Sequence, residues 1–182
     1  MNPWTILDSV FVRKKSKPCF SKSTRINPRA EIFGNVFIGH DSTIGHSRII
    51  AEGDSIITIG KDSTIRDRIE IMAKGSDIES KETKIKDIYI GSKVFISSEV
   101  CINGPTIISD CTFIGHKTRI TNAIIGSNCL IEDNVFIKNV VIPPDSVIPG
   151  KSIIDSKEKL NQIISGNNQV NYCEFTNKEQ AI

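Results

Sequence analysis

Three histidines are the side chains of this 182-residue sequence best suited to hold a metal ion or act as a general base. His40, His46 and His116 each lie two places after an isoleucine, in Ile-Gly-His runs. A catalytic zinc site needs three protein ligands that converge on the ion. No His-x-His or His-x-x-Glu spacing supplies a nearby partner. We therefore expect solvated histidines at turns.

Thiol chemistry is the next possibility, and the cysteine spacing argues against a thiolate site. The five cysteines are an odd number and contain no Cys-x-x-Cys pair: Cys19, Cys101, Cys111, Cys129 and Cys173. Neither a disulfide framework nor a structural zinc site follows from this pattern. We expect reduced, half-buried thiols.

The overall charge of the chain bears on whether it binds nucleic acids or membranes. The net charge is +2, with 23 basic and 21 acidic residues. This balance predicts no nucleic-acid or membrane partner, and the basic run at 13–17 is interpreted as part of a solvated arm. No apolar core of a signal peptide and no membrane-spanning run is found, so we expect a cytoplasmic protein.

A six-residue repeat of isoleucine must position these side chains. Isoleucine occupies 34 of the 182 positions. The main series run in steps of six: Ile26, Ile32, Ile38, Ile44 and Ile50; Ile59, Ile65 and Ile71; Ile90, Ile96, Ile102, Ile108, Ile114 and Ile120; Ile125, Ile131 and Ile137; Ile142, Ile148 and Ile154. Six is not a helical period, and turn signals recur too often for a hairpin sheet. The pattern predicts a parallel β-helix in which isoleucines form inward ladders, with glycines after them that adopt unusual backbone conformations at the corners.

The repeat also divides the chain. We predict an N-terminal arm at 1–25, a β-helix at 26–154, a C-terminal helix at 155–166 and a polar tail at 167–182. Asp155 and Ser156 can cap the helix and Gly166 can end it. The register breaks by three residues between Ile50 and Ile59, and by thirteen before Ile90, where a polar loop is expected.

These irregularities carry a resemblance to a known family. Residues 48–67 read RIIAEGDSIITIGKDSTIRD, and residues 90–149 contain IGSKVFISSEVCINGP, FIGHKTRITNAIIG and IKNVVIPPDSVIP. This sequence resembles γ-class carbonic anhydrases, and especially the carbonic-anhydrase-like domain of carboxysome scaffold proteins, over about residues 25–154. The resemblance implies an all-β, left-handed parallel β-helix of hexapeptide repeats with a C-terminal α-helix, assembled as a homotrimer.

The zinc ligands of that family are missing. The resemblance places its three histidines at Met72, Ser98 and Asn103. Thioether, hydroxyl and amide groups are poor donors to Zn²⁺, so we expect no cofactor and no zinc-hydroxide mechanism. Cys101 could approach this position, although a buried spectator thiol is the simpler interpretation.

Other family positions are partly kept, and we interpret them as a vestigial pocket. The resemblance matches Glu52, Asp67 and Asn122 to family residues, whereas Arg66 replaces a glutamine, Arg68 a glycine and Ile50 an arginine. One hypothesis is that Arg66 or Arg68 replaces the charge of zinc and binds an anion such as bicarbonate. The alternative is that both arginines form intersubunit salt bridges.

Three functions remain open at this point. The first is a non-catalytic structural or scaffold trimer that serves CO₂ concentration within a carboxysome-like or organellar assembly. Dynactin pointed-end subunits are similar zinc-free coils, and the RIIAE…IG segment is similar to one of them. The second is a hexapeptide-repeat acyltransferase with His116 as general base. The third is a residual carbonic anhydrase with a rebuilt site.

Overall fold

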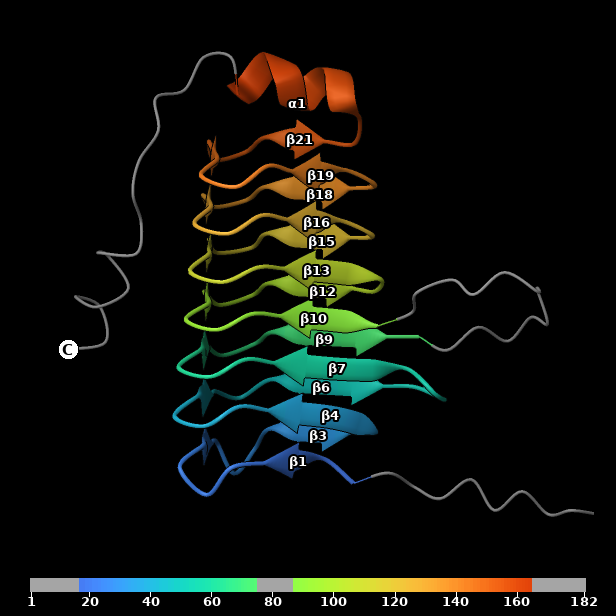
Figure 1. The fold of residues 1–182 in the computed structure, drawn as a ribbon, viewed down its shortest axis with the longest axis vertical. Coiled ribbons are helices and arrows are strands. Elements are labelled where there is room, and N and C mark those ends of the chain that lie inside the picture. The colour runs from blue at the N-terminus through green and yellow to red at the C-terminus, as the bar shows by residue number, and fades with distance from the viewer. Residues whose placement is uncertain (1–16, 75–86, 165–182) are drawn as a thin grey trace, which may run out of the picture.

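The computed structural model describes residues 17–74 and 87–164 as a left-handed parallel β-helix (Figure 1). Its strands form three parallel sheets, here named A, B and C. Sheet A contains β1 (Cys19–Phe20), β4 (Asn35–Ile38), β7 (Ile56–Ile59), β10 (Ile88–Ile90), β13 (Thr106–Ile108), β16 (Ile124–Ile125) and β19 (Val141–Ile142). Sheet B contains β2 (Arg25–Ile26), β5 (Thr43–Ile44), β8 (Thr64–Ile65), β11 (Phe95–Ile96), β14 (Phe113–Ile114), β17 (Leu130–Ile131) and β20 (Val147–Ile148). Sheet C contains β3 (Glu31–Phe33), β6 (Arg48–Ala51), β9 (Glu70–Ala73), β12 (Cys101–Asn103), β15 (Arg119–Thr121), β18 (Phe136–Lys138) and β21 (Ile153–Ile154).

Each turn of the coil contributes one strand to each sheet. Strands three apart in the chain are therefore neighbours, as in the order β1-β4-β7-β10 of sheet A. The strands are short because the chain turns a corner after every hexad, and the hydrogen bonds run from one turn to the next. The predicted fold class is confirmed.

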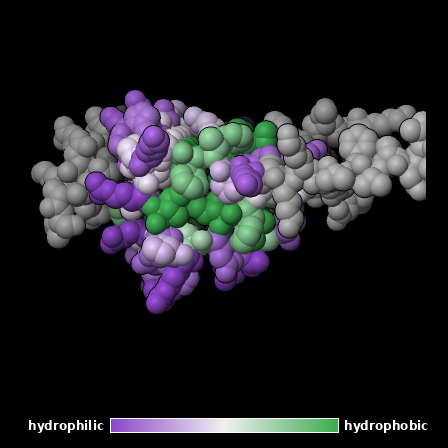
Figure 2. All heavy atoms as spheres, turned by 90° about the horizontal axis from the view of Figure 1, so that it is seen from below, coloured by the Kyte–Doolittle hydropathy of each residue, from purple (hydrophilic) through white to green (hydrophobic). Residues whose placement is uncertain are grey.

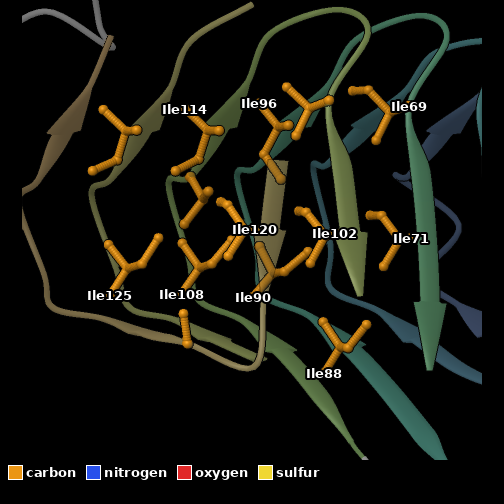
Figure 3. Packing of buried hydrophobic residues seen from close by; sticks show 14 of the residues in the cluster. Ile69, Ile71, Ile88, Ile90, Ile96, Ile102, Ile108, Ile114, Ile120 and Ile125 are labelled. Carbon is orange, nitrogen blue, oxygen red and sulfur yellow. The ribbon is translucent and has the colours of Figure 1, made fainter. Parts of the chain in front are cut away.

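The core is a set of isoleucine ladders that run along the coil (Figure 3). In sheet B, Ile65, Ile96 and Ile114 follow one another in register, and none of them is exposed to solvent. Sheet C has the same arrangement with Ile71, Ile102 and Ile120. A β-branched side chain suits these positions because it fills the inner surface of a strand with little loss of rotamer freedom.

One predicted anchor of the ladder is wrong. The sequence series places Ile50 in the core, but Ile49 is the fully buried residue, and it lies in register between Ile32 and Ile71. Ile50 points outward and is half-buried, between Phe33 and Met72. Ile49 and Ile50 are adjacent, so either could follow Ile44 in the repeat. The chain reaches its next inward position one residue earlier than the six-residue repeat predicts, so Ile49 and not Ile50 enters the core.

The glycines after the anchors have a different role from the one expected. Gly60 does not adopt a positive φ; instead, a Cβ atom there would lie 2.5 Å from the backbone carbon of Gly91 in the next turn. Close stacking of successive turns therefore requires glycine. The left-handed corner conformation belongs to the residue two places later, as at Asp62 with φ of 56°. Asp and Asn tolerate this region better than most other residues.

The two ends of the coil differ. Helix α1 (Lys157–Ile164) covers the C-terminal end, where Leu160 is buried and Ile163 and Ile164 pack on the core. The Ser156 hydroxyl accepts a hydrogen bond from the Lys159 amide at 3.4 Å, as expected of a cap. The N-terminal end presents hydrophobic residues at its centre, surrounded by hydrophilic ones (Figure 2).

Several predicted segments fall partly outside the described residues. Strand β1 lies within the segment 1–25 that was assigned to the arm, and α1 lies within 155–166. The tail at 167–182 and most of the polar loop, residues 75–86, are outside the described part of the chain. Within the described residues, no helix has both the length and the apolar character needed to cross a membrane.

Candidate functional site

A column of charged side chains follows the corner between sheets B and C, here called the charged corner. It is built from the connections between β8 and β9, β11 and β12, and β14 and β15. Arg68 Nη2 lies 2.8 Å from Glu99 Oε1, which links two successive turns. The other carboxylate oxygen of Glu99 lies 3.7 Å from Lys117 Nζ and 3.8 Å from His116 Nε2. One half-buried carboxylate therefore faces three basic groups.

The remaining arginine of the predicted pocket is also engaged within the chain. The guanidinium carbon of Arg66 lies 5.8 Å from the ring centroid of Phe95, over its face. Phe95 in turn stacks on Phe113 with centroids 5.3 Å apart. A cation above an aromatic face is attracted by the ring quadrupole. Each arginine proposed as an anion ligand thus has a partner in its own chain.

Asp67, the aspartate of this corner that the resemblance singles out, bonds to the backbone. Asp67 Oδ1 accepts a hydrogen bond from the backbone amide of His46 at 2.7 Å. Asp133 Oδ1 does the same for the amide of His116, also at 2.7 Å. Each aspartate therefore connects its own turn to the preceding turn of the coil, which is a structural role for both.

The three positions at which the resemblance implies zinc ligands lie on and beside sheet C. Met72 on β9 and Asn103 on β12 are neighbours in register, and both are half-buried. Ser98 lies in the charged corner, where its carbonyl oxygen accepts a hydrogen bond from the Lys117 amide at 3.2 Å. Asn103 Nδ2 donates to Cys101 Sγ at 3.4 Å. These groups offer a thioether, a hydroxyl and an amide, which do not form a zinc site.

Glu52 and Asn122 are not brought to the charged corner. Both lie at the corner between sheets C and A, where the strands of sheet C end, whereas Arg66 and Asp67 lie at the corner where these strands begin. Asn122 Nδ2 donates to Asn139 Oδ1 at 2.7 Å in the next turn. The vestigial pocket predicted from Glu52, Arg66, Asp67 and Asn122 is therefore not assembled within one chain.

The histidines occupy two different corners. His46 and His116 lie in the charged corner three turns apart, whereas His40 lies at the corner between sheets A and B. Donor atoms of His40, Asp41 and Asp62 fall within 4.8 Å of one another. His40 Nδ1 already lies 2.7 Å from Asp41 Oδ2, and this contact lowers the pKa of the Asp41 carboxyl.

Two thiols of the coil, Cys101 and Cys129, have a raised pKa. Burial raises the pKa of Cys101, although the nearby Asn103 amide opposes this. Burial raises the pKa of Cys129 to about 11. A nucleophilic cysteine requires a lowered pKa, so neither environment suits covalent catalysis.

A shallow groove lies near the C-terminal end of the coil. It has a volume of about 650 Å³ and is lined by Phe113, Leu130, Glu132, Asp133, Asn134, Pro149, Gly150 and Lys151. Its two carboxylates are engaged: Glu132 Oε2 accepts a hydrogen bond from the Gly150 amide at 2.8 Å, and Asp133 accepts one from His116.

Sequence reasoning missed Glu99 and Lys117. The signal was available in the repeat, because Arg68, Glu99 and Lys117 each lie three places after an inward isoleucine of sheet B. All three have a positive φ, between 58° and 63°. Residues at that offset stack at one corner, so charges of opposite sign there predict ion pairs between turns.

Comparison with known proteins extends the fold assignment. No protein-family model and no curated protein matches the sequence. A hexapeptide transferase family protein from Anaplasma phagocytophilum aligns with a TM-score of 0.62 and 15% identity, over 88% of this chain and 92% of that chain. LpxA, a UDP-N-acetylglucosamine acyltransferase from Bacteroides fragilis, aligns with a TM-score of 0.57 and 16% identity, over 88% of this chain and 65% of that chain. The chain thus has the β-helix fold of hexapeptide-repeat transferase structures.

Proposed function

We propose that this chain is a non-catalytic structural subunit that works by association with other protein chains. The main observation behind this proposal concerns Met72 and Asn103, which are adjacent in register on sheet C. At the positions where the resemblance to γ-class carbonic anhydrases implies zinc ligands, these residues and Ser98 supply no competent donor for the metal. The structural trimer implied by that resemblance, and the role in a larger assembly, belong to this proposal.

The charged corner supports the same function. Arg68 is paired with Glu99, and Arg66 lies over Phe95. Both contacts lie between successive turns, so these two arginines support the stacking of the coil.

The test is CO₂ hydration by the purified full chain with Zn²⁺ added, beside a zinc-dependent carbonic anhydrase assayed in parallel. We expect the chain to hydrate CO₂ no faster than buffer does. Zinc-dependent hydration by the wild-type chain would contradict the proposal and would require ligands other than Met72, Ser98 and Asn103.

A second candidate function is acyl transfer, and two observations favour it. The structural neighbours with TM-scores of 0.62 and 0.57 are named as a hexapeptide transferase family protein and an acyltransferase. In this chain His116 Nε2 lies 3.8 Å from Glu99 Oε2, and a carboxylate beside an imidazole is an arrangement that general bases use.

This candidate is tested by thiol release from acetyl-CoA in the presence of amino sugar acceptors. A general base at His116 predicts that His116→Ala abolishes turnover while the folded structure persists by circular dichroism. The non-catalytic function predicts no release above buffer from either protein. Turnover that depends on His116 would replace the first proposal by the second.

A further inference from the structure

The C-terminal end of the coil shows how the core ladder is closed at its last turn. The inward residues of that turn, one from each sheet, are at most 1% exposed: Ile142, Ile148 and Ile154. Helix α1 lies across this end (Figure 1) and buries Leu160 against the same core. A short segment with a few apolar side chains is therefore enough to close one end of the coil.

Among residues 17–74 and 87–164, the N-terminal end has no such cover. Phe20 holds the inward position of sheet A, in register with the buried Ile38, yet 51% of Phe20 is exposed. Ile26 and Ile32 hold the inward positions of sheets B and C and are only half-buried. Figure 2 views this end and shows its hydrophobic centre. The first strand of each sheet is also an edge that lacks a neighbour on one side, which is a site where chains aggregate unless it is covered.

The chain carries an apolar segment directly before this end. The nine residues from 4 to 12, here called the leading segment, include six apolar ones: Trp4, Ile6, Leu7, Val10, Phe11 and Val12. Helix α1 closes the other end with eight residues, so nine are long enough. The four residues 13–16 join the leading segment to the first turn and can span ~13 Å when extended. The leading segment can therefore reach the centre of the open end.

The sequence argues that the leading segment does not add another turn to the coil. Lys14 and Asp8 stand six and twelve places before Phe20. A continued hexad would place these two charges in the inward ladder, where burial of an unpaired charge is costly. The apolar residues of the leading segment thus need a different place to be buried.

A second copy of the chain fits the open end less well. The rim of the first turn exposes the basic residues Lys22, Arg25 and Arg29, and two such ends placed together would bring like charges into contact. In a head-to-tail stack the open end would meet α1, whose exposed residues include Lys157 and Glu158. A segment tethered beside the site also has a high effective concentration there.

We propose that the leading segment folds back over the N-terminal end of its own coil and buries Trp4 and Phe11 against Phe20, Ile26 and Ile32. Both ends of the coil are then closed, one by α1 and the other by the leading segment. Closed ends prevent the coils from stacking into filaments, so contacts with other chains must use the sides of the coil. This inference does not depend on whether the chain is catalytic.

The first experiment uses Trp4, which is the single tryptophan of the chain. Its fluorescence is measured in the purified full chain with acrylamide as the quencher. We expect emission at short wavelength and weak quenching in wild type, and emission at longer wavelength with severalfold stronger quenching in Phe20→Asp. Val141→Asp is the matched control, because it places the same charge on an apolar residue that is 61% exposed in the last turn. It is expected to leave Trp4 as protected as in wild type.

Three results would overturn the proposal. One is a wild-type Trp4 that is quenched as strongly as in urea-unfolded protein. Another is unchanged quenching in a Phe20→Asp protein that circular dichroism shows to be folded, which would place Trp4 elsewhere. The third is protection that disappears on dilution together with a fall in sedimentation mass, which would assign the open end to the leading segment of a second copy.

A second experiment alters only the leading segment, so that the sequence of the coil is unchanged. Phe11→Asp is expected to release the segment and uncover the end, which raises the fluorescence of the apolar dye ANS above that of wild type. The double variant Phe11→Asp with Phe20→Asp should lose most of this increase, because the uncovered end is then charged. No increase in Phe11→Asp, or an increase that the double variant keeps in full, would contradict the proposed position.

Discussion

The guanidinium of Arg68 lies 2.8 Å from the carboxylate of Glu99, and this ion pair joins two successive turns at the charged corner. The pair gives Arg68 a structural role, because it links two turns of the coil. Arg68 is mostly exposed and Glu99 is half-buried, so the pair is partly screened by solvent.

We expect Arg68 and Glu99 to be energetically coupled, but weakly. A double-mutant cycle with Arg68→Ala and Glu99→Ala should give a coupling free energy of about 0.2–1 kcal/mol, which falls as salt is raised. The measurement is the free energy of unfolding in urea. A coupling of zero at low salt would show that the contact does not stabilise the coil.

The position of the core ladder is tested by two adjacent residues. Ile49 is fully buried and Ile50 points outward. Ile49→Ala should reduce the free energy of unfolding by about 2–5 kcal/mol, because it leaves a cavity in the ladder. Ile50→Ala is the matched control and should cost much less. Equal losses in urea denaturation, or a larger loss at Ile50, would refute the register.

The stacking of turns predicts an effect at Gly60. A Cβ atom there would lie 2.5 Å from the Gly91 carbonyl carbon, so Gly60→Ala should force turns apart and cost about 1–3 kcal/mol. Gly150→Ala is the comparison, since its closest contact would be 3.1 Å. Thermal unfolding followed by circular dichroism measures both. A Gly60→Ala protein as stable as wild type would contradict the close approach.

The buried thiol of Cys129 predicts a dependence of stability on pH. Its pKa is raised to about 11 by burial, whereas the ordinary value is 9.0. The unfolded chain therefore loses this proton at lower pH than the folded chain does. The stability contributed by Cys129 is present below about pH 9 and is lost as the pH rises toward 11.

Two measurements check this. Urea midpoints taken from pH 8 to 11 should fall more steeply for wild type than for Cys129→Ala. At neutral pH, iodoacetamide should modify exposed Cys19 well before Cys129. Parallel slopes for the two proteins, or early modification of Cys129, would show that the thiol is not held neutral by the fold.

The sequence predicts the coil well because the isoleucines that fill its core recur at a regular interval along the chain. Ile96, Ile102 and Ile114 fall where the hexad places them, since each must fill the same inner space in its turn. The error at Ile49 and Ile50 arose because two apolar neighbours satisfy one pattern equally. The glycine error arose because a repeat reveals which residue type is required, but not whether space or backbone angle requires it.

The site was less predictable, for a physical reason. Contacts such as those of Arg68 with Glu99 join residues thirty-one places apart, and only the stacking of turns brings them together. A resemblance aligns Glu52 and Arg66 to one family pocket, yet the fold places them at different corners of this chain.

The most direct test of the non-catalytic account is the zinc content of the purified, untagged chain after incubation with Zn²⁺ and dialysis, measured by mass spectrometry. His40→Ala is analysed beside wild type, because His40, Asp41 and Asp62 could hold zinc adventitiously at a different corner. We predict that neither protein retains zinc above the dialysis buffer, or that any zinc retained is lost with His40. Zinc near one atom per chain in both proteins would contradict the account.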